Sequence, residues 1–144
     1  DFAPYNHVFR DGAFVGAIDF DICYPAPRLW DLAYTAYRYL PLTPHLNDPI
    51  VDGSTWGRSH FLPSQIEERL HTFLDAYAGD TATLRYPASA LLGYLPPRLI
   101  SMADWCDRQE DETLRRNGLM YRAHAAWIAG GARGVADVVQ VRDA

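Results

Sequence analysis

The sequence of 144 residues contains no lysine, because all 13 of its basic residues are arginine. The chain therefore cannot supply a Schiff-base lysine, a P-loop lysine or the lysine that positions the nucleotide in kinases. Cysteine is also scarce. Cys23 and Cys106 lie far apart and form no Cys-x-x-Cys pair, so the sequence predicts no zinc site. We interpret both cysteines as small buried apolar residues of a protein from a reducing compartment.

Long hydrophobic runs are absent as well. No run of 18 apolar residues occurs, and no basic segment leads into an apolar stretch, so we expect neither a membrane span nor a signal peptide. A net charge of −5 argues against a nucleic-acid partner. With 49% hydrophobic residues, the chain can form one globular domain over residues 1–144. We expect a cytoplasmic protein without membrane or nucleic-acid partners.

The predicted elements are one hairpin and several helices. Short apolar segments on either side of Asp11-Gly12 predict a β-hairpin over residues 8–19, and Asp-Gly suits its tight turn. Helical periodicity, capping signals and helix breakers predict five helices over residues 28–40, 64–79, 81–94 with an interruption near Pro87, 96–116 and 119–129. Residues 41–62 read as a long loop. The predicted class is mostly α with a small β-hairpin (α+β), and the hairpin should pack on the helices.

Three oxygen-bearing side chains form a candidate site. Asp1 and Asn6 make an Asp-x-x-x-x-Asn pair, and Asp19 follows at the exit of the predicted hairpin. Phosphoryl transfer needs such a set. One carboxylate handles the proton of the attacking hydroxyl, while an amide oxygen and a second carboxylate hold magnesium. We therefore expect Asn6 and Asp19 to converge, with Asp1 nearby.

The motifs at residues 1–6, 18–21 and 28–33 resemble, in this order, the catalytic core of the aminoglycoside phosphotransferase family. That family includes choline-kinase-like and other small-molecule kinases and shares the protein-kinase-like fold. The resemblance implies that Asp1 is the catalytic aspartate and that Asn6 and Asp19 bind magnesium. It implies that Asp31 is a structural aspartate, which ties a buried helix to the catalytic-loop backbone. Asp21 is either a further residue of the metal site or a cap of the following loop.

The resemblance covers about residues 1–40. The histidine and glycine that precede the aspartate in that family are absent, as are its glycine-rich loop, its nucleotide-positioning lysine and the glutamate paired with that lysine. It therefore implies only the C-terminal lobe of a kinase-like fold, with residues 1–27 carrying the site and residues 28–144 forming a helical subdomain. We expect the catalytic-lobe portion of a phosphotransferase that uses ATP and Mg²⁺ on a small-molecule hydroxyl and is inactive as this isolated chain.

A second interpretation is a non-catalytic helical interaction or dimerisation module, derived from a kinase-like lobe. Apolar surface left uncovered around the hairpin and the helix over residues 28–40 would promote a homodimer. Two further segments have alternative readings. The acidic run Asp107–Glu112 is either a solvated helix face or an attractant for a cationic substrate. Trp56 is a candidate for lining a substrate pocket, whereas the aromatic residues of the helix over 28–40, Tyr34 among them, read mainly as core.

Overall fold

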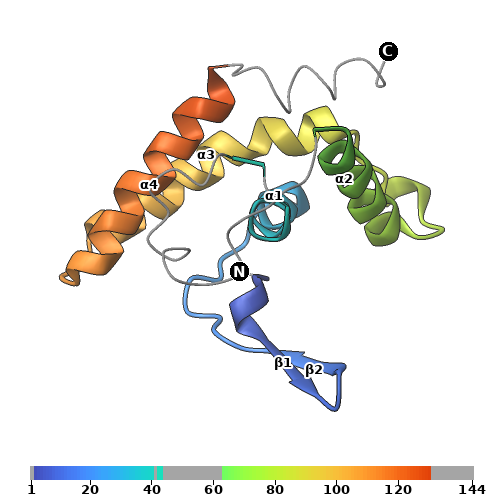
Figure 1. The fold of residues 1–144 in the computed structure, drawn as a ribbon, viewed down its shortest axis with the longest axis horizontal. Helices are drawn as coiled ribbons and strands as arrows, with labels where there is room; N and C mark the ends of the chain where they lie inside the picture. The colour runs from blue at the N-terminus through green and yellow to red at the C-terminus, as the bar shows by residue number, and fades with distance from the viewer. Residues whose placement is uncertain (1, 41, 44–62, 131–144) are drawn as a thin grey trace.

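The computed structural model describes residues 2–40, 42–43 and 63–130. It is mostly helical with one small antiparallel sheet, as expected. Its elements are β1 (His7–Arg10), β2 (Ala13–Ala17), α1 (Arg28–Tyr39), α2 (Pro63–Ala78), α3 (Ala88–Asp107), α4 (Glu112–Ala129) and two 3₁₀ turns at Pro4–Asn6 and Ala82–Leu84. The long helix α3 extends between α2 on one side and α4 on the other, and α1 packs against it (Figure 1).

The hairpin prediction is confirmed. Asp11 and Gly12 have φ angles of 51° and 79°, the positive values that a tight two-residue turn needs. The register shifts between Val8 and Phe9, so the ladder carries an irregularity of the bulge type. The expected packing on the helices is wrong for most of the hairpin. Figure 1 shows it extending away from them, and Phe9 is 59% exposed.

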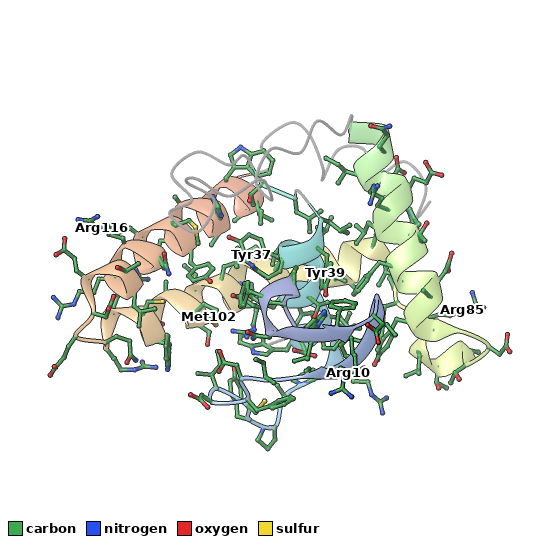
Figure 2. All side chains as sticks on the ribbon, turned by 60° about the horizontal axis from the view of Figure 1, so that its bottom comes forward. Arg10, Tyr37, Tyr39, Arg85, Met102 and Arg116 are labelled. Carbon is green, nitrogen blue, oxygen red and sulfur yellow. The ribbon has the colours of Figure 1, made fainter. Side chains whose placement is uncertain are left out.

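Helix α1 occupies the predicted range and forms part of the core. Its residues 32–37 are all buried, and its Tyr37 hydroxyl is 2.7 Å from Nδ1 of His124 on α4. Hydrogen bonding of this kind is what buried polar side chains require. Figure 2 shows Tyr37 and Met102 within the molecule and Arg116 at its periphery. Helix α2 was also predicted, and it is followed by Gly79 at a φ of 49°.

Helix α3 corrects two predictions. Residues 82–84 form only a 3₁₀ turn, and α3 begins after Pro87 and continues through Pro96 and Pro97, where we had placed a helix start. A proline inside a helix removes one backbone hydrogen bond and crowds the carbonyl four residues earlier. Pro97 and Gly93 are both exposed, so the carbonyl released at Gly93 can bond to water. The buried stripe runs unbroken past the prolines and holds the helix together.

Helix α4 corrects the prediction that Asn117-Gly118 breaks a helix. The helix spans both residues, so the described residues contain four α-helices rather than the five expected. The reason is close packing of α4 on α3. A Cβ atom at Gly118 would lie 2.9 Å from Oδ1 of Asp107 and 3.2 Å from Cβ of Cys106. The glycine therefore permits helix contact and does not mark a turn.

Candidate functional site

Two of the three predicted site residues lie close together through their backbones. The amide of Ile18 donates a hydrogen bond of 2.9 Å to the carbonyl of Asn6, which places Asp19 directly beside the Pro4–Asn6 turn. Asn6 is buried, with 4% of its surface exposed, whereas Asp19 is exposed. Asp1, the predicted catalytic aspartate, lies outside the described residues.

Asp19 has a left-handed backbone conformation. Its φ is 62°, and the only other non-glycine residue with a positive φ in the described part of the chain is Asp11 of the hairpin turn. Aspartate tolerates this region better than most residues, but the conformation still costs free energy and is concentrated at functional sites. It redirects the chain after β2 towards residues 20–22.

Asp31 corrects part of the expectation for α1. We predicted an aspartate buried on an apolar helix, but Asp31 is exposed in the first turn of α1. A carboxylate there interacts favourably with the positive end of the helix dipole. That Asp31 ties α1 to the backbone of the predicted catalytic loop stays a prediction. Cys23 is likewise exposed rather than buried, whereas Cys106 is buried as expected.

A pocket of about 350 Å³ opens beside Asp19. It lies between α1, α3, α4 and the segment that follows the hairpin. The lining residues are Tyr5, Asp19, Asp21, Ile22, Tyr34, Met102, Trp105, Cys106, Leu114, Asn117 and Tyr121. Its size falls at the lower end of the range for small-molecule sites, and its mixture of aromatic walls and few polar groups is typical of them. Asp21 thus faces the same pocket as Asp19.

Three phenol groups form a chain along this pocket. The Tyr34 hydroxyl lies 2.8 Å from that of Tyr121 and 3.3 Å from that of Tyr5. Burial raises the pKa of Tyr121 to about 12, although Arg38 opposes the shift, and burial raises the pKa of Tyr34 as well, with Tyr121 and Tyr5 adding to the rise. Both groups are therefore neutral hydrogen-bond donors at physiological pH.

Two guanidinium groups lie against the faces of these rings. Arg38 is 5.2 Å from the ring centroid of Tyr5, and Arg98 is 4.5 Å from that of Tyr34. Arg98 is buried, and its Nε atom has no hydrogen-bond partner within the described ranges, so the aromatic faces provide its visible stabilisation. Neither arginine lines the pocket. The charged groups that do line it are the carboxylates of Asp19 and Asp21.

The acidic run at residues 107–112 has structural contacts. Asp107 and Asp104 pair with Arg122, and Asp111 caps α4 by accepting a hydrogen bond of 3.0 Å from the Leu114 amide. That bond lowers the pKa of Asp111 below its usual value. These contacts favour the structural interpretation of the run over attraction of a cationic substrate. Trp56, the other candidate pocket residue, is outside the described residues.

The oxygen donors at Asn6 and Asp19 are of a type that suits magnesium. Mg²⁺ is usually held by one or two carboxylates, with waters and substrate phosphates completing its coordination. Asp19 is exposed beside the pocket and can supply the carboxylate, whereas Asn6 is buried and is not one of the pocket-lining residues. Across the described ranges, no group of three or more His, Cys, Asp or Glu side chains is arranged to hold a metal ion. An all-protein cage is therefore not formed by those residues.

Sequence reasoning missed most of the pocket. Tyr34 was interpreted mainly as core, Asn117 as a helix break and Cys106 as a small apolar residue. The hydroxyl contact between Tyr34 and Tyr121 joins residues 87 positions apart, and a single sequence carries no signal for such a pairing. The unbroken apolar stripe of α3 could have indicated that Trp105 and Met102 belong to one helix with residues 88–95.

Comparison with known proteins gives no relative for this chain: no family model, no curated protein and no solved structure matches it. No helix among the described residues is long and apolar enough to cross a membrane.

Proposed function

We propose that this chain is the catalytic-lobe portion of an ATP- and Mg²⁺-dependent phosphotransferase that acts on a small-molecule hydroxyl. The observation that carries the proposal is the placement of Asp19, in a left-handed conformation, beside the Asn6 turn and at a ligand-sized pocket. An exposed carboxylate next to a pocket is where a metal bound to a phosphate would be needed. The motif resemblance supplies the reaction class.

In this proposal Asp19 and Asn6 would hold Mg²⁺, and the ion would supply positive charge against the transferred phosphate. Asp1 accepts or orients the proton of the attacking hydroxyl. The pocket positions the acceptor molecule, and its tyrosine and tryptophan walls exclude water. Because the chain has no lysine to hold the nucleotide phosphates, we expect no measurable phosphotransfer from these 144 residues alone.

The metal site can be tested directly with Mn²⁺, which substitutes for Mg²⁺ and broadens nearby NMR signals. We expect selective broadening around residues 5–6 and 18–22, and its loss in Asp19→Asn. Asp11→Asn is the matched control, because Asp11 is an exposed carboxylate with a positive φ but does not line the pocket. Broadening that persists in Asp19→Asn, or that disappears equally in Asp11→Asn, would refute the site. Turnover of ATP by the isolated chain with a panel of alcohols would refute the half-enzyme interpretation.

A second candidate function, a dimerisation module, is favoured by the uncovered hairpin. Val8, Phe9, Phe14 and Val15 are between 40% and 59% exposed, and exposed apolar patches of this kind mark interaction surfaces. We expect sedimentation velocity to detect self-association that Phe9→Glu abolishes. A protein that remains monomeric at high concentration would remove this candidate.

A further inference from the structure

Asn117 places an unsatisfied acceptor in the wall of the pocket. The residue is 8% exposed, and its Oδ1 atom has no hydrogen-bond partner among the described residues. A buried acceptor without a partner destabilises the folded state, and such groups in folded proteins call for an explanation. Because Asn117 lines the pocket, a ligand in that space could supply the missing donor.

The phenol chain offers the complementary group. Tyr5, Tyr34 and Tyr121 carry three O–H donors but make two hydrogen bonds among themselves, so one O–H remains to be used elsewhere. All three residues line the same pocket as Asn117. A hydroxyl group both donates and accepts hydrogen bonds, so a hydroxylated ligand can satisfy the amide oxygen and the remaining phenol proton together.

The other walls limit the size and charge of the ligand. A cavity of about 350 Å³ accommodates a molecule of about one or two rings. Trp105, Met102 and Leu114 provide apolar surface on which a ring can lie. The carboxylates of Asp19 and Asp21 disfavour an anionic ligand and accept further hydrogen bonds from hydroxyl or ammonium groups.

We propose that Asn117 is a specificity-determining residue, whose side-chain oxygen accepts a hydrogen bond from a small hydroxylated ring compound bound in this pocket. The inference rests on the proposed function in one respect, since it takes this compound as the phosphate acceptor. Binding itself needs neither nucleotide nor metal and is tested without them.

The test is an NMR titration of the 144-residue chain in EDTA with methyl glucoside and with its 2-amino counterpart. The pair separates a hydroxyl from an ammonium group as the donor. We expect saturable shifts in residues 102–106 and 114–121, and a roughly five- to tenfold weakening in Asn117→Leu, the loss typical of one hydrogen bond. Asn117→Asp keeps the acceptor and should retain binding. Gln65→Leu makes the same amide-to-leucine change on α2, away from the pocket, and should have no effect.

Thermal unfolding of the same variants distinguishes a binding role from a structural one. Because Asn117 Oδ1 has no partner in the described structure, Asn117→Leu should keep or raise Tm while it weakens binding. The proposal is overturned if neither compound binds, if Asn117→Leu binds as tightly as the native chain, or if that variant loses stability as a hydrogen-bonded residue would. Binding without an Mn²⁺ site would leave this inference standing and refute the phosphotransfer proposal. An Mn²⁺ site without ligand binding would do the reverse.

Discussion

The hydroxyl chain of the pocket can be tested by removing one oxygen at a time. Tyr34→Phe deletes the central hydroxyl and both of its contacts, at 2.8 Å to Tyr121 and 3.3 Å to Tyr5. It also leaves the Tyr121 hydroxyl, on a residue only 3% exposed, without the contact seen in the structure. Tyr121→Phe removes one contact and leaves Tyr34 able to bond to Tyr5.

The two substitutions should therefore lower the free energy of unfolding by different amounts. A buried hydrogen bond contributes about 1 kcal/mol, and stranding a buried hydroxyl adds about 1–2 kcal/mol. We expect Tyr34→Phe to lower the free energy of unfolding by about 2–3 kcal/mol and Tyr121→Phe by about 1 kcal/mol. The double variant strands no hydroxyl and loses the shared hydrogen bond only once, so its cost should be about 2–3 kcal/mol smaller than the sum of the two.

Urea unfolding monitored by circular dichroism measures these free energies, and an unchanged m-value would indicate that the same surface is exposed in each variant. The corresponding fall in Tm for Tyr34→Phe is roughly 5–10 °C for a chain of this length. Strictly additive costs, or a larger loss for Tyr121→Phe than for Tyr34→Phe, would show that the hydroxyl chain does not contribute as described.

Three further predictions concern packing, capping and pH. Gly118→Val should lower the free energy of unfolding by about 2–3 kcal/mol, because the valine side chain would collide with α3. Gly118→Ala should lower it less, since alanine favours a helix, and urea unfolding compares the two variants. Asp111→Ala should lower Tm, while Asp111→Asn, also a good N-cap, should retain most of it; a loss equal in both variants would contradict the cap. Because the pKa of Tyr121 is raised in the folded chain, its contribution to stability is complete below pH 10 and is lost as pH rises from 10 towards 12. Over that range the free energy of unfolding should therefore fall less steeply with pH in Tyr121→Phe than in the native chain.

Short sequence signals correctly predicted those turns and helix ends that depend on the backbone preferences of a few neighbouring residues. The Asp11-Gly12 turn and the helix ending before Gly79 follow from backbone preferences of single residues, and both were placed correctly. The same reasoning failed at Pro96-Pro97 and at Gly118. There the usual helix-breaking meaning of proline and glycine is outweighed by tertiary packing of α3 against α1 and α4.

The candidate site divides in the same way. Asp19 and Asp21 follow from a motif and lie at the pocket, but most of the remaining wall residues come from three helices that meet only in the folded chain. Asn117 was predicted to break a helix, so its buried oxygen could not be anticipated. Long-range contacts such as that between Tyr34 and Tyr121 require the fold itself.

The two prolines inside α3 have a consequence for local opening of the structure. Neither Pro96 nor Pro97 has a backbone N–H group, so the helix lacks the two hydrogen bonds that would join its halves at this point. The C-terminal half packs on α4 near Gly118. Hydrogen exchange should therefore divide α3 into two cooperative units, with residues 98–107 protected together with α4 and residues 88–95 exchanging at a rate of their own. The pocket wall at Met102 and Trp105 belongs to the first unit, so ligand binding should slow exchange in that half alone.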